Sequence, residues 1–129
     1  MNFFDPSENS LREWARSGLP WPVEDFDLLV ASEDRAALLV ELASSPAREF
    51  ALHCLYLIVG DAVRSDFNTS SRAQIEAMLA DAEGASSSDP AIGRWIAESH
   101  DLLEHPDHFE YGLWCDGGLA RRAAGNLSS

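Results

Sequence analysis

Residues 46–64 are apolar on almost every side, and this segment constrains the fold more than any other feature of the sequence. Ser45 and Pro46 form the cap-then-proline pair that favours the start of a helix. The apolar positions that follow lie nearly all around the predicted helix: Phe50, Cys54, Leu55, Leu57, Ile58, Ala62 and Val63. A helix of this kind is stable only when other elements cover it. We therefore predict that it is the centre of the fold.

Signals for further helices recur along the chain, and no pair of strands joined by a hairpin turn is recognisable. Capping residues, prolines and the helical period of apolar positions predict these helices at residues 6–17, 22–30, 33–43, 71–83 and 90–105. The predicted fold class is therefore all-α. We expect a single compact domain of about six helices over residues 1–122, with stacked HEAT-like hairpins as the alternative arrangement.

The C-terminal part of the sequence is less regular. Residues 107–119 follow neither a helical nor a strand period, because Gly112, Gly117 and Gly118 interrupt the run of alternating aromatic and apolar residues. We predict an irregular aromatic segment that covers one end of the helices. Residues 123–129 are expected to form a frayed tail.

The composition excludes several classes of partner. The 129-residue chain has 22 acidic and nine basic residues, which gives a formal charge of −13. Such a charge opposes binding to nucleic-acid phosphates or to an anionic membrane, so we expect neither as a partner. The first residues lack a signal-peptide pattern, and the longest apolar run, 55–59, is far shorter than the about 20 residues of a membrane span. These features favour a cytoplasmic protein.

The acidic residues are gathered in two places. The first group is Glu24, Asp25, Asp27, Glu33 and Asp34, and the second is Glu98, Asp101 and Glu104, whose three-residue spacing Asp107 and Glu110 continue. Like charges three apart on a helix repel each other by about 0.2–0.5 kcal/mol per pair. A sequence that has a negative helical face in spite of this repulsion therefore indicates that the face has a function. The alternative is that carboxylates in first helical turns complement the helix dipole and that the charge maintains solubility.

The tryptophans divide into two kinds. Trp14 and Trp95 lie on apolar helical faces and are expected in the core. Trp21 lies between two prolines and Trp114 lies in the irregular segment, where an indole can anchor a protein interface or pack under a loop. We predict a small acidic protein-interaction domain that binds a basic protein partner through the two acidic groups and these two indoles. By analogy of composition alone, an immunity- or inhibitor-type protein is one such domain.

No catalytic residue, metal or cofactor is predicted, and the sequence favours a protein that is not an enzyme. It contains no metalloprotease, phosphate-loop or nucleophile-elbow motif, and the adjacent His53 and Cys54 would point about 100° apart on a helix. The alternative is an enzyme, or a protein that binds a small ligand or a metal, with a site between helix 90–105 and segment 107–119. Its candidate residues are His100, His105, His108, Tyr111 and Asp116.

Overall fold

A computed structural model describes residues 7–18, 20, 26–84 and 89–126, and all regular elements within these residues are helical. The α-helices are α1 (Glu8–Ser17), α2 (Phe26–Val30), α3 (Ala36–Leu42), α4 (Arg48–Arg64), α5 (Arg72–Gly84), α6 (Pro90–Glu104), α7 (Tyr111–Trp114) and α8 (Gly118–Asn126). Two 3₁₀ turns, η1 (Glu33–Arg35) and η2 (Pro106–His108), precede α3 and follow α6. The predicted all-α class is confirmed. Among the described helices, none is long and apolar enough to cross a membrane.

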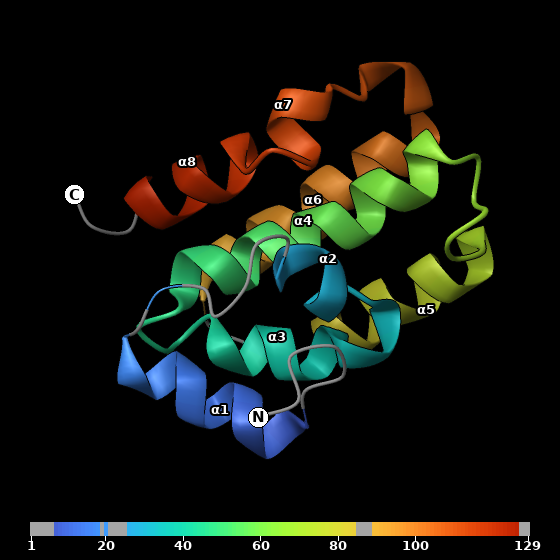
Figure 1. Cartoon of the computed structure of the whole chain (residues 1–129). Coiled ribbons are helices and arrows are strands. Elements are labelled where there is room, and N and C mark those ends of the chain that lie inside the picture. The colour runs from blue at the N-terminus through green and yellow to red at the C-terminus, as the bar shows by residue number, and fades with distance from the viewer. Residues whose placement is uncertain (1–6, 19, 21–25, 85–88, 127–129) are drawn as a thin grey trace.

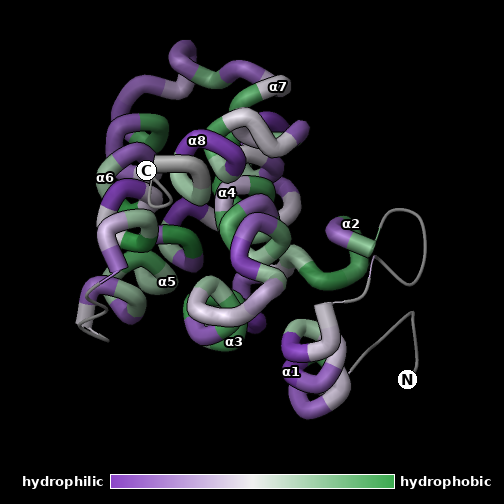
Figure 2. Tube along the Cα trace, turned by 90° about the vertical axis from the view of Figure 1, so that its left-hand side faces the viewer, coloured by the Kyte–Doolittle hydropathy of each residue, from purple (hydrophilic) through white to green (hydrophobic). Residues whose placement is uncertain are grey.

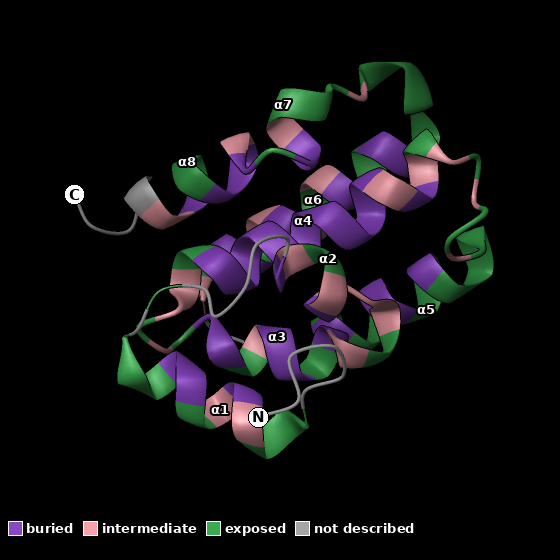
Figure 3. Cartoon of the chain, in the orientation of Figure 1, coloured by how far each residue is buried: buried purple, intermediate pink, exposed green. Residues whose placement is uncertain are grey.

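Helix α4 is the centre of the molecule, as its sequence predicts. Every residue from 50 to 60 is buried, and the helix contacts α2, α3, α5, α6, α7 and α8 (Figures 1 and 3). In a stack of hairpins each repeat contacts only its neighbours. One helix with six helical neighbours favours a bundle over the stacked alternative.

Aromatic rings join the N-terminal helices to α4. The Trp14 ring meets Phe26 edge-on at 5.1 Å and Phe50 at 4.9 Å between centroids, and Phe26 stacks on Phe50 at 5.5 Å. Trp95 on α6 is fully buried, so both predicted core tryptophans lie in the core. The rings of Trp14, Phe26 and Phe50 hold α1 and α2 against α4. Helices α1 and α2 lie at one edge of the molecule (Figure 2).

The helix ends follow the capping residues closely. Ser7 accepts a hydrogen bond from the Ser10 N–H at the start of α1, and Gly18 ends this helix with a φ of 69°. Asp89 caps α6 by accepting a hydrogen bond from the Ala91 N–H. Helix α4 begins at Arg48 and not at Pro46: a turn closed by the Arg48 N–H and the Ser45 carbonyl oxygen precedes it, and the Ser45 hydroxyl accepts a hydrogen bond from the Ala47 N–H.

The C-terminal part of the fold differs from the prediction. Residues 107–119 contain most of η2, all of α7 and the start of α8, and α8 continues through residues 123–126, where a frayed tail was expected. The glycines account for the difference. Gly117 forms the turn with a φ of 83°, and a Cβ atom on Gly118 would lie 2.7 Å from the Gly112 carbonyl oxygen. They allow α7 and α8 to pack closely, and do not mark irregular backbone.

Two helical glycines, Gly60 and Gly93, provide a matched test of the packing of α7 against α4. In Gly60→Ala, the new Cβ would lie 2.8 Å from Trp114 Cβ and 3.1 Å from Cys115 Sγ, so α7 must move away from α4. We expect Gly60→Ala to lower the free energy of unfolding by about 1–3 kcal/mol, measured by urea denaturation. Gly93→Ala, whose Cβ meets nothing within 4 Å, should raise it by about 0.5–1 kcal/mol. Equal effects would contradict the close approach at Gly60.

Candidate functional site

The first acidic group is divided by the fold. Asp27 is largely internal, with a side chain 14% exposed, and its Oδ2 lies 2.7 Å from His53 Nε2. Glu33 accepts a hydrogen bond from Gln74 Nε2 at 3.2 Å, and Asp34 accepts one from the Ser32 hydroxyl on the surface. Glu24 and Asp25 lie outside the described residues. Asp27 is thus an internal partner of a histidine, and Glu33 and Asp34 are available to a ligand.

The second acidic group is also partly committed to the fold. Glu98 accepts hydrogen bonds from the Tyr56 hydroxyl at 2.7 Å and from Arg94 Nε at 3.2 Å. Asp101 accepts a hydrogen bond from His108 Nδ1 at 3.0 Å, and Glu104 is exposed. The carboxylates of this group therefore do not form one continuous free face.

The expected aromatic anchors are not found on the surface that the structure describes. Trp114 is 5% exposed and meets the Tyr56 ring edge-on at 5.3 Å, so it is a core residue that holds α7 against α4. Trp21 lies outside the described residues.

Glu33 and Asp34 lie on a groove between η1–α3 and α5, which we call the α3–α5 groove. Helices α3 and α5 contact each other. The groove between them has a volume of about 410 Å³. Its lining is Glu33, Asp34, Ala36, Ala37, Val40, Gln74, Ala77, Met78, Asp81 and Ala82. Small alanine side chains on both helices leave this space open. The lining thus combines an apolar floor with three carboxylates and no basic residue.

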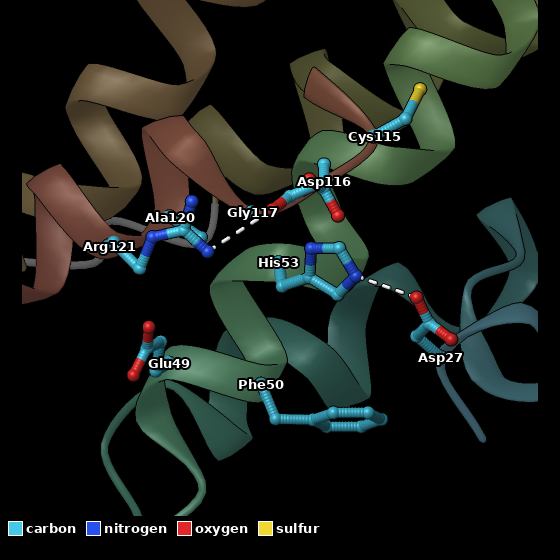
Figure 4. Close-up of a pocket in the computed structure, with 9 residues that line it drawn as sticks. All are labelled: Asp27, Glu49, Phe50, His53, Cys115, Asp116, Gly117, Ala120 and Arg121. Carbon is cyan, nitrogen blue, oxygen red and sulfur yellow. Dashed lines mark hydrogen bonds and ion pairs between the residues drawn. The ribbon is translucent and has the colours of Figure 1, made fainter. Parts of the chain in front are cut away.

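A second concave site, the His53 pocket, lies between α2, α4 and the start of α8. Its volume is about 510 Å³, and it is lined by Asp27, Glu49, Phe50, His53, Cys115, Asp116, Gly117, Ala120 and Arg121. Figure 4 shows the imidazole of His53 directed toward Asp27, while the Arg121 guanidinium donates a hydrogen bond to the Asp116 carbonyl oxygen at 3.2 Å. The pocket therefore presents charges of both signs to a ligand.

The thiol in the His53 pocket is not suited to nucleophilic catalysis. Burial, together with the neighbouring carboxylate of Asp61, raises the pKa of Cys115 to about 12. Burial also raises the pKa of Cys54 well above its usual value. Since the thiolate is the nucleophile, neither cysteine provides one at neutral pH. His53 acts in the structure as the hydrogen-bonded partner of Asp27.

The residues of the alternative ligand or metal site are only partly brought together. His105 and His108 stack with 4.9 Å between ring centroids, and with Asp107 they form a group whose potential ligand atoms lie within 4.8 Å of one another. We call these three residues the histidine cluster. His100 lies on the exposed side of α6, and Asp116 lines the His53 pocket. Tyr111 is exposed, with the Arg64 guanidinium 5.9 Å from its ring centroid.

The histidine cluster has no helical spacing in the sequence, because Pro106 lies between its two histidines. Pro106 starts η2, and the His108 N–H donates a hydrogen bond to the His105 carbonyl oxygen. A proline directly after a helix end, with histidines on both sides, is the signal that could have identified it. The His53–Asp27 contact joins residues 26 positions apart and has no local signal.

Comparison with protein-family models, with curated proteins and with solved structures finds no match for this chain.

The internal role of Asp27 can be separated from a surface role by stability. Asp27→Ala leaves a buried histidine without its acceptor, and we expect it to lower the free energy of unfolding by about 1–3 kcal/mol. Asp34→Ala, at an exposed position, should change it by less than about 0.5 kcal/mol. Urea denaturation of both variants measures the difference. An unchanged stability in Asp27→Ala would contradict the structural role.

The raised thiol pKa values predict low reactivity. With a disulfide reagent at pH 8, we expect both cysteines of the folded protein to remain unmodified over minutes, and both to react once denaturant is added. The absorbance of the thiolate that the reagent releases measures the number of protein thiols modified. Rapid reaction of one thiol in the folded protein, lost in Cys115→Ala, would show that the His53 pocket holds an activated thiol.

Proposed function

We propose that this protein is a small acidic interaction domain that binds a basic, amphipathic segment of a protein partner in the α3–α5 groove. The observation that carries the proposal is the combination of an apolar floor with a rim formed by Glu33, Asp34 and Asp81 and without a basic lining residue. The inhibitor-type role expected from the composition is one form of this function.

Charge supports a basic partner. The chain has a formal charge of −13, and a field of one sign can raise the association rate of an opposite charge by about 10–10³ at low salt. Arginine or lysine side chains of the partner would lie against the three rim carboxylates. Glu33 is already held by Gln74, which limits the entropy lost when a cation pairs with it.

The shape of the groove supports an amphipathic segment. Val40 and Met78 supply apolar surface from the two sides, and the exposed Ala37 and Ala77 leave room above them. A volume of about 410 Å³ holds a few apolar side chains and not a folded domain. A helix that presents apolar anchors at i, i+3 or i+4 toward such a groove places basic side chains at its rim.

Two exposed alanines of α5 give a matched test. Ala77 lines the groove and Ala80 does not, so Ala77→Arg and Ala80→Arg change the charge equally but only the first places a cation in the groove. The probe is a labelled helical peptide of about 15 residues with leucines on one face and arginines elsewhere. By fluorescence anisotropy, we expect Ala77→Arg to weaken binding about tenfold or more, a loss of about 1.4 kcal/mol, and Ala80→Arg to weaken it far less.

Salt and a second peptide complete the experiment. Binding of the arginine peptide should weaken as salt rises, and a peptide with glutamates in place of the arginines should not bind. Equal loss in the two variants would mean general attraction to the acidic protein and would overturn the groove as the site. Binding of the glutamate peptide, or of a small apolar ligand alone, would overturn the basic partner.

A further inference from the structure

We propose that His105, Asp107 and His108 bind one divalent transition-metal ion of the zinc type. Potential ligand atoms of the three side chains lie within 4.8 Å of one another, and all three side chains are exposed. Two imidazoles and one carboxylate are a ligand set that zinc uses in proteins. The proposal is independent of the α3–α5 groove, because the two sites share no residue.

The backbone positions the two imidazoles. His105 ends α6, and Pro106 starts the 3₁₀ turn η2, whose last residue is His108. The His108 N–H donates a hydrogen bond to the His105 carbonyl oxygen at 2.9 Å, and this turn brings the two residues together. The two rings lie 4.9 Å apart with an angle of 29° between their planes. The fixed φ of Pro106 limits the freedom of the turn, so the pair is held together before an ion binds.

Asp101 orients one of the imidazoles so that its Nε2 faces away from the Asp101 carboxylate. His108 Nδ1 lies 3.0 Å from Asp101 Oδ2, and a carboxylate can only accept, so Nδ1 carries the proton. In the neutral ring, Nε2 then bears the lone pair and is free to coordinate. A carboxylate behind a ligand histidine is the outer-shell arrangement that orients metal-binding imidazoles.

The separation of the ligand atoms is compatible with coordination after small side-chain rotations. Ligand atoms about 2.0–2.1 Å from a tetrahedral zinc ion are about 3.4 Å apart. The atoms of the histidine cluster lie within 4.8 Å of one another, so they need to approach by at most about 1.4 Å. Exposed side chains can rotate by this amount without moving the backbone. The remaining coordination positions would face solvent.

The surrounding charge favours a cation at this position. The histidine cluster follows the C-terminal end of α6, where the helix carries a partial negative charge. Asp101 and the exposed Glu104 add carboxylates on the last turn of the same helix. The regular spacing of acidic residues along α6 and beyond it would thus increase the local concentration of cations. Magnesium and calcium prefer sites formed by oxygen ligands alone, which this ligand set is not.

Calorimetric titration of the untagged, chelator-treated protein with zinc chloride tests the proposal. We expect one ion per chain, and at least about a tenfold loss of affinity in His105→Asn and in His108→Asn. His100→Asn removes an exposed histidine of α6 outside the cluster and should leave the affinity unchanged. Asp101→Asn, which keeps all three ligands, should weaken binding by about 10–100-fold. Circular dichroism checks that each variant is folded.

A second readout reports the ligands directly. Cobalt(II) in place of zinc should give visible absorption of a tetrahedral or five-coordinate ion, which zinc then displaces. The proposal is overturned if the wild-type protein binds neither ion at micromolar concentration, or if His100→Asn loses as much affinity as His105→Asn. It is also overturned if the double variant His105→Asn/His108→Asn binds zinc as tightly as the wild type. These outcomes do not depend on whether the helical peptide binds in the α3–α5 groove.

Discussion

Burial of α4 on all sides is the constraint on which the rest of the structure depends. Eleven consecutive positions, residues 50–60, are removed from water, so helices must cover this segment in every direction. No single neighbour can do this, and the covering helices come from both sides of α4 in the chain: α2 and α3 before it, and α5, α6, α7 and α8 after it. The candidate sites lie on these covering helices and the turns that join them.

The parts of the fold that local chemistry determines could be predicted from the sequence. Gly18 ends α1 and Asp89 caps α6 as their conformational freedom and side chain indicate, because a cap needs only its own helix. Helix α1 itself begins at Glu8, with Ser7 as its cap, two residues after the predicted start. The parts that depend on packing could not be predicted in this way. Gly118 and Trp114 resemble residues of an irregular loop. Only the approach of α8 to α7 shows the role of Gly118, and only the contact with Tyr56 on α4 shows that of Trp114.

The same distinction applies to the candidate sites. Asp27 and Glu98 are acidic residues of ordinary sequence context, and their partners, His53 and Tyr56, are 26 and 42 positions away. A list of carboxylates therefore overestimates the free negative surface. Glu33 and Asp34 retain a surface role because α5 passes beside them, which the sequence does not reveal. The histidine cluster is local, and a turn that starts at Pro106 would have been sufficient to find it.

The position of α8 over α4 has a consequence for synthesis. A ribosome completes α4 before it adds residues 65–126, and the last of these form the helix that covers it. At 5–20 residues per second this interval lasts roughly 3–12 s, during which the most apolar helix of the nascent chain lacks the cover that α5 to α8 provide. The growing polypeptide must therefore be shielded, by transient collapse or by a chaperone, until its C-terminal helix emerges.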